Sequence, residues 1–348
     1  MSFAYDTALA TYVWLENIIV DSANGFLYAG DTKDAPFPGP YYGFIIKVDL
    51  SSFTAVAEIN IGSKDNHEGA AVIDSVNGYA YFGTLSGSVG YIEKIRLSDF
   101  THQGTLTLGS GYIPQCLILD DAGYMYSMSG NLRTKKVFKI SLSSFTVVDD
   151  SCILSGMVNP GAGIKIGDYI YWGCGIVGRN DGLISKMSIA SLSEVATLTI
   201  TGGSIPEGLA YDGTYLYVAY YSYSPYVSYV AKVNLSTLTV VATLTLSSPF
   251  DYCRTCFICD NYLYVMSLNC VLYQIRLSDF SLVTYIDKSD RIEHYSSAYD
   301  SINKKGYFSS IYESEYGSPS QILRFSLGGV ELPISSILFL DEEPIILI

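Results

Sequence analysis

Short runs of alternating apolar and polar residues fill most of the chain. In "GTLTL" at 104–108, Leu106 and Leu108 fall on one side of an extended chain and Thr105 and Thr107 on the other, which is the two-residue period of a half-buried strand. Other runs are apolar and aromatic throughout, such as "YIYWG" at 169–173, and indicate aromatic-rich strands. Turn residues separate these runs, so the pattern predicts many short strands.

The segment "KIRLSDF" recurs with variations along the chain. It begins at Lys47, Lys94, Lys139, Lys186, Lys232, Gln274 and Arg324, with successive spacings of 47, 45, 47, 46, 42 and 50 residues. Each repeat holds an apolar strand, an aromatic strand, the "KIRL" strand and an alternating strand, which fits one blade of a propeller. A parallel β-helix, the main alternative, has shorter coils without this four-strand order. The repeats therefore predict an all-β fold, a seven-bladed β-propeller of four-stranded antiparallel blades.

The polar turn residues within the segment explain why the segment recurs in each repeat. Ser98 and Asp99 are predicted to cap the hairpin between the third and fourth strands, because short polar side chains bond the local backbone. Phe100 is predicted to begin the outer strand and to cover the edge of the blade. Every blade needs this corner, so every blade repeats it.

The repeat also resembles a known family. The stretch "GYAYFGT…KIRLSDFTHQGTLTLGSGYIPQCLILDD" is similar to the YVTN-type β-propeller repeat, and the resemblance extends over about residues 14–327. It departs from that pattern in the last blade, which lacks a clean fourth strand. The resemblance implies the propeller fold, and it implies little about function because such propellers occur in binding, structural and enzymatic proteins.

The last blade can be completed in two ways. Residues 2–13, "SFAYDTALATYV", precede the first repeat and are expected to supply its outer strand, while Ile334–Leu340 is the competing segment. We expect residues 1–330 to form one propeller domain. Residues 331–348 then form an apolar C-terminal tail, which packs along the propeller or serves as an assembly segment.

Composition and charge exclude some classes of function. Apolar residues make up 49% of the chain, and the formal net charge is −14, which opposes binding to nucleic acid. No apolar run reaches the length of a membrane span, so no membrane insertion is expected. The first residues lack the positive charge of a signal peptide. We therefore expect cytoplasmic synthesis, followed by retention in the cell or display on a particle or cell exterior.

The sequence offers few candidates for a catalytic or metal-binding site. Seven cysteines include the run "CRTCFIC" at 253–259, but no second Cys or His pair stands at a distance that would complete a metal site. We expect this run to be a buried strand. The three histidines, His67, His102 and His294, belong to no known catalytic motif. No enzyme activity, cofactor or metal is therefore expected.

A ring of polar residues is predicted at one mouth of the central channel. Aligning the first strand of each repeat places seven residues at one equivalent position: Glu16, Glu68, Gln115, Gly161, Glu207, Arg254 and His294. All except the glycine are candidate ligand-binding residues for a small polar molecule or a cation. The alternative is that they are ordinary polar residues of a wet channel mouth.

Tyrosine-rich loops are predicted on the same face, between the second and third strands. Tyr offers a flat apolar face and a hydroxyl group, which suits recognition of a glycan or a protein. The candidate residues are Phe37, Tyr41, Tyr42, Tyr220, Tyr221, Tyr223, Tyr226 and Tyr312. The alternative is that these aromatic residues only cover the rim.

These features favour a non-enzymatic recognition or structural subunit of a larger assembly, such as a virus particle or a cell-surface complex. Its expected partners are proteins of that assembly and carbohydrate. One alternative is an intracellular protein-interaction scaffold. The other is a hydrolase or lyase with Glu68, Glu207, Arg254 and His294 at the channel mouth.

Overall fold

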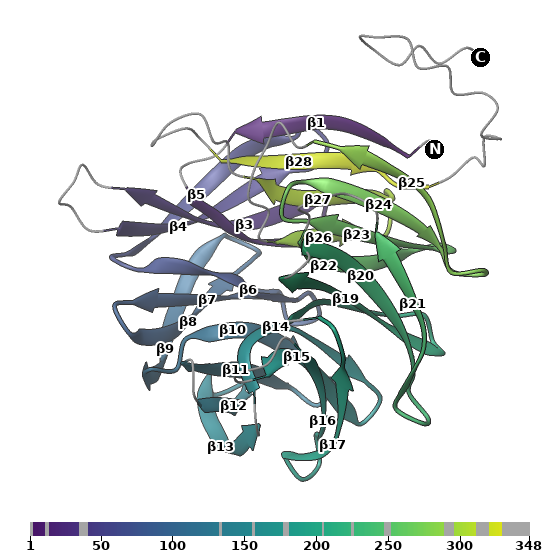
Figure 1. Cartoon of the computed structure of the whole chain (residues 1–348). Coiled ribbons are helices and arrows are strands. Elements are labelled where there is room, and N and C mark those ends of the chain that lie inside the picture. The colour runs from purple at the N-terminus through teal and green to yellow at the C-terminus, as the bar shows by residue number, and fades with distance from the viewer. Residues whose placement is uncertain are drawn as a thin grey trace.

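Seven four-stranded antiparallel sheets are arranged as blades around a central channel (Figure 1). The computed structural model describes residues 3–10, 14–34, 41–131, 134–154, 157–176, 181–203, 205–223, 226–246, 252–288, 296–310 and 320–328. These residues form strands and turns and no helix, so the prediction of an all-β seven-bladed propeller is confirmed. They include no helix long and apolar enough to cross a membrane.

The first four blades follow the chain from the channel outward. Blade 1 holds β2 (Trp14–Asp21), β3 (Phe26–Asp34), β4 (Tyr41–Asp49) and β5 (Thr54–Gly62). Blade 2 holds β6 (Asp65–Asp74), β7 (Tyr79–Ser86), β8 (Val89–Arg96) and β9 (Thr101–Ser110). Blade 3 holds β10 (Pro114–Leu119), β11 (Tyr124–Asn131), β12 (Thr134–Ser141) and β13 (Thr146–Leu154). Blade 4 holds β14 (Met157–Ile166), β15 (Tyr169–Ile176), β16 (Gly182–Ser188) and β17 (Ser193–Ile200).

The remaining blades complete the ring. Blade 5 holds β18 (Ile205–Tyr211), β19 (Tyr215–Tyr223), β20 (Tyr226–Asn234) and β21 (Thr239–Leu246). Blade 6 holds β22 (Cys253–Cys259), β23 (Tyr262–Ser267), β24 (Val271–Arg276) and β25 (Ser281–Asp287). Blade 7 holds β26 (Ser297–Asp300), β27 (Lys305–Ser310), β28 (Gln321–Ser326) and the N-terminal strand β1 (Ala4–Ala10).

The N-terminal strand β1 is the outer strand of blade 7. It pairs antiparallel with β28, from Ala4 opposite Ser326 to Ala10 opposite Gln321. Asp6 on β1 accepts hydrogen bonds from Ser326 Oγ at 2.7 Å and from Lys305 Nζ. Strands from the two ends of the described chain therefore lie in one sheet. The competing segment Ile334–Leu340, and the rest of the tail, lie outside the described residues.

The lysine of the repeat links the strands of a blade to the next blade. In blade 2 the Nζ atom of Lys94 lies 4.1 Å from the ring centroid of Tyr79 and donates a hydrogen bond of 3.2 Å to the carbonyl of Leu142 in blade 3. Burial lowers the pKa of Lys94. The same lysine–aromatic contact occurs in blades 1, 3, 4 and 5, so this part of the repeat serves the fold.

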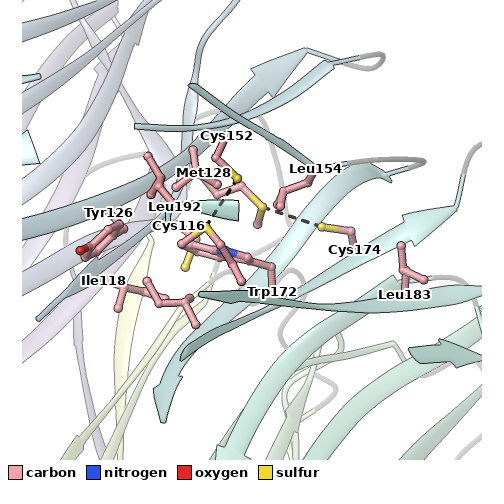
Figure 2. Packing of buried hydrophobic residues seen from close by; sticks show 13 residues of the cluster. Cys116, Ile118, Tyr126, Met128, Cys152, Leu154, Trp172, Cys174, Leu183 and Leu192 are labelled. Atoms are coloured by element: carbon pink, nitrogen blue, oxygen red, sulfur yellow. Dashed lines mark hydrogen bonds between the residues drawn. The ribbon is translucent and has the colours of Figure 1, made fainter. Parts of the chain in front are cut away.

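Apolar clusters fill the spaces between neighbouring blades. The cluster between blades 3 and 4 contains the fully buried Trp172 and five sulfur-bearing side chains (Figure 2). Cys152 Sγ lies 3.6 Å from Met187 Sδ, and Cys174 Sγ lies 3.9 Å from Met128 Sδ. Sulfur-bearing side chains fill irregular space well, so these cysteines have a packing role.

Candidate functional site at the channel mouth

The predicted channel-mouth residues share one backbone feature. In blade 1, Leu15 and Asn17 of β2 pair with consecutive residues of β3, and Glu16 between them is left without a partner residue. Gln115, Glu207 and Arg254 are left out of the strand pairing in the same way. Such a β-bulge redirects the side chain of the extra residue. The sequence alignment of these positions therefore corresponds to a structural equivalence.

Neighbouring members of this ring are in contact. The Nε atom of Arg254 lies 3.1 Å from Oε2 of Glu207, an ion pair whose geometry is not that of an aligned hydrogen bond. Gly161, also a bulge residue, lies so close to blade 5 that a Cβ atom there would come within 2.8 Å of Glu207 Cα. The ring positions of blades 4, 5 and 6 are thus adjacent, and the Arg254 guanidinium neutralises the carboxylate of Glu207.

A buried lysine that the sequence analysis missed lies beside Gln115. Lys135 Nζ is 3.4 Å from Gln115 Oε1, and the Lys135 side chain is only 1% exposed. Burial lowers the pKa of Lys135 to about 8, because a desolvated ammonium group is disfavoured. Lys135 stands four residues before the repeat lysine, where the other blades have Gly43, Gly90, Gly182, Ser228, Cys270 and Ser320. A lysine at a position where the other blades have small residues is the sequence signal by which Lys135 could have been found.

The other two ring residues are not described as side chains. Glu68 lies within β6, with its side chain outside the described residues, and His294 lies outside them altogether. The described part of the ring thus consists of five of the seven residues, Glu16, Gln115, Gly161, Glu207 and Arg254.

The predicted aromatic loops need one correction. Tyr220 and Tyr221 lie within β19 and are 4% and 5% exposed, so they are core residues. Tyr220 stacks on Tyr229 with ring centroids 5.3 Å apart, and Tyr221 meets Tyr252 edge-on at 4.6 Å. These contacts exist because β19 and β20 extend the hairpin beyond the expected strand end.

The remaining aromatic candidates divide into two groups. Tyr42, on β4, is 37% exposed, as the recognition role requires. The side chains of Tyr41, Tyr223 and Tyr226 lie outside the described residues, as do Phe37 and Tyr312 entirely.

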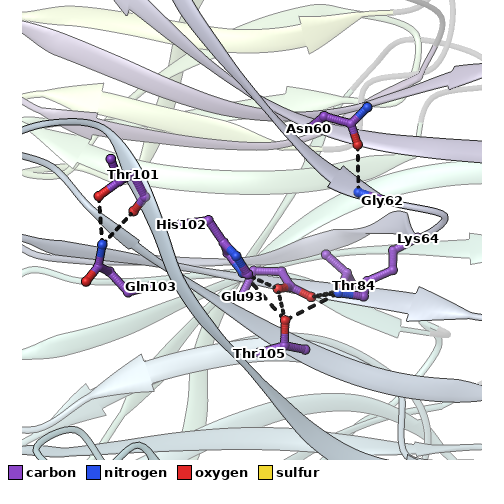
Figure 3. Close-up of polar contacts among 9 residues, drawn as sticks. All are labelled: Asn60, Gly62, Lys64, Thr84, Glu93, Thr101, His102, Gln103 and Thr105. Carbon is purple, nitrogen blue, oxygen red and sulfur yellow. Dashed lines mark hydrogen bonds and ion pairs between the residues drawn. The ribbon is translucent and has the colours of Figure 1, made fainter.

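Blade 2 contains a second polar cluster that the sequence analysis did not find (Figure 3). The carboxylate of Glu93 is fully buried and lies 2.8 Å from Lys64 Nζ and 2.8 Å from His102 Nε2. It also accepts hydrogen bonds from the hydroxyls of Thr84 at 3.2 Å and Thr105 at 2.6 Å. With four partners, this carboxylate is satisfied by the protein itself, so the cluster is structural.

The cysteine run lies on β22, as expected, and its thiols are free. Burial raises the pKa of Cys256 to about 12 and that of Cys116 likewise to about 12. A protonated buried thiol is a poor nucleophile and a poor metal ligand. Across the described ranges, no group of three or more His, Cys, Asp or Glu residues is placed to hold a metal ion.

Comparisons with known proteins support the fold. No protein-family model matches the chain, and no curated protein matches it. A solved structure titled Kuenenia stuttgartiensis Hydrazine Synthase is similar to it, with a TM-score of 0.69 and 13% sequence identity over 89% of this chain and 96% of that chain. At this identity the similarity shows a shared β-propeller fold alone. The YVTN-type assignment remains a prediction.

Proposed function

We propose that this protein is a non-enzymatic recognition and structural subunit of a larger assembly, such as a virus particle or a cell-surface complex. The observation that carries the proposal is a repeated apolar residue on the rim. Val56, Val148, Val195 and Val241 are the bulge residues of the outer strands in blades 1, 3, 4 and 5. Each is between 51% and 54% exposed. Each offers an exposed apolar side chain, and we assign these side chains to contacts with other proteins of the assembly.

The chemistry at the channel mouth supports a non-enzymatic role. Glu207 forms an ion pair with Arg254, so a guanidinium already engages this carboxylate. Burial keeps the thiols of Cys116 and Cys256 protonated at neutral pH, and they do not supply a nucleophile.

Recognition is assigned to the tyrosine-bearing face. Tyr42 contributes an exposed aromatic ring at the end of the β3–β4 hairpin, and an exposed ring stacks on the apolar face of a sugar or on a protein side chain. The proposed ligands are therefore glycans or proteins. The propeller itself is proposed to be of the YVTN type, on the resemblance of its repeats.

Labelling of the native source tests the proposal. Intact cells and released particles are treated with a membrane-impermeant amine reagent, and labelled lysines of this protein are identified by mass spectrometry. Labelling before lysis is expected for an exposed subunit, whereas labelling only after lysis contradicts that role.

Binding is then measured on an array of immobilised glycans. The Tyr42→Ser variant is expected to lose binding, while Tyr285→Ser, which alters an exposed tyrosine of the rim, is expected to retain it. Equal binding by both variants would remove Tyr42 from the proposed recognition surface.

A further inference from the structure

The outer strand of blade 5, β21, differs from the other outer strands in its residues. Its sequence "TVVATLTL" contains no ionisable residue, no Gly and no Pro. The other six outer strands each carry at least one of these: β5 has Glu58, β9 has His102, β13 has Asp149 and Asp150, β17 has Glu194, β25 has Asp287 and β1 has Asp6. Charges and Pro are among the means by which an edge strand avoids pairing with another chain, and β21 has neither.

The backbone of β21 is also regular where pairing would occur. After the bulge at Val241, residues Ala242–Leu246 pair in unbroken register with Ser228–Lys232 of β20. Leu244 and Leu246 pack into the cluster shared with blade 6, while Thr243 and Thr245 are exposed. One edge of this segment pairs with β20 and the other faces the rim (Figure 1). Its β-branched residues have high strand propensity.

The charge of the molecule indicates what pairs with this edge. Two copies of a chain with a net charge of −14 repel each other over most of their surfaces. The β21 edge places no charge of its own against a second copy. An antiparallel pair about a two-fold axis places the same uncharged residues opposite one another, so a second β21 is complementary to the first.

We propose that two copies of this protein pair through β21, forming one eight-stranded sheet across two propellers. This inference rests on the proposed assembly role and names one partner, a second copy of the chain. The exposed Val195 and Tyr285 on the neighbouring outer strands β17 and β25 supply apolar surface on either side. A contact built around one strand pair belongs to the small, weak class of interfaces, below about 1,200 Å², so association depends on protein concentration.

Sedimentation equilibrium of the full chain, from about 10 to 500 μM as such a weak contact requires, provides the first test. The wild type is expected to form a dimer, and Thr245→Lys is expected to weaken it at least tenfold by placing two like charges at the paired edges. Thr199→Lys is the matched control, because Thr199 occupies the equivalent exposed position on β17. It is expected to leave the dimer unchanged. Circular dichroism of each variant verifies that the blades are folded.

Cross-linking provides the second test. Single cysteines are introduced at Val241, Thr243 and Thr245, with Thr197→Cys on β17 as the control, and the protein is oxidised mildly. A disulfide-linked dimer from at least one β21 position and none from β17 supports the pairing. A monomeric wild type overturns it, as does a dimer that Thr245→Lys leaves intact. Each of these results can coexist with exposure of the protein on a native particle, so failure of the dimer and failure of the proposed function are distinguishable.

Discussion

The ring of Phe100, at the corner of blade 2, lies 5.8 Å from the ring of Tyr28 in blade 1, and Phe100 adopts a φ of +50° to place it there. The left-handed region is unfavourable for a residue with a Cβ atom. Phe53, Phe145 and Phe280 adopt the same conformation, with φ of 51° each, and each contacts a tyrosine of the preceding blade. In blades 1, 2, 3 and 6 the recurring corner therefore joins the blade to the one before it, instead of only covering its own edge.

This geometry predicts an unusual order among substitutions at Phe100. Phe100→Ala removes the ring contact and keeps the strained backbone, so it is expected to lower the free energy of unfolding by about 2 to 3 kcal/mol. Phe100→Gly removes the same contact but relieves about 1 kcal/mol of backbone strain. Glycine is therefore expected to be the less destabilising change, as measured by urea unfolding. Alanine as the more stable variant would show that the positive φ is not a source of strain.

The buried Lys135 predicts a dependence of stability on pH. Its pKa in the folded protein is about 8 against an ordinary value of 10.5, so the unfolded chain binds more protons between these values. Stability therefore rises as the pH increases from about 8 to 10.5. Below pH 8 the full penalty of about 3 kcal/mol is present, from the 1.36 kcal/mol of each pKa unit.

Lys135→Met tests this dependence by removing the ammonium group from the same buried space. It is expected to stabilise the protein at pH 7 and to flatten the rise above pH 8, measured by urea unfolding across that range. Lys165→Met, which alters a lysine in a surface ion pair with Asp121, serves as the control. An unchanged pH profile for Lys135→Met would assign the rise to other groups.

The Glu93 cluster predicts that a buried carboxylate contributes more to the free energy of unfolding than a carboxylate on the surface. Glu93→Gln keeps the size of the side chain but removes the charge that faces Lys64 and His102. Loss of charge-assisted hydrogen bonds at a buried site is expected to cost about 2 to 4 kcal/mol in unfolding free energy. Asp121→Asn, at a carboxylate that is almost fully exposed, is expected to change the unfolding free energy far less, because solvent screens an exposed ion pair. Equal costs for the two would show that the cluster contributes no more than a surface pair.

The features that recur in every blade could be predicted from the sequence. The strand order and the equivalence of Glu16, Gln115, Glu207 and Arg254 follow from a repeat that every blade shares, and the structure adds that each of them is a bulge residue. Sequence reasoning failed where a single blade departs from the repeat, as at Lys135, which lies beside Gln115, and at Glu93, which pairs with Lys64. Tyr220 and Tyr221 were misplaced because a strand rich in Tyr and Ser has the composition of a loop.

Closure of the ring by β1 predicts complementation by a peptide. Deleting residues 1–13 exposes the edge of β28 and leaves Lys305 and Arg324 without the carboxylate of Asp6. The truncated chain is expected to melt at a lower temperature, because an open propeller loses the pairing that joins its ends. A synthetic peptide of residues 1–13 added in excess is expected to restore the melting temperature by binding to the free edge. The same peptide with Asp6→Lys is the control and is expected to fail, since it places like charges against Lys305 and Arg324. Equal rescue by both peptides would mean that backbone pairing alone, and not the Asp6 ion pairs, holds the ring closed.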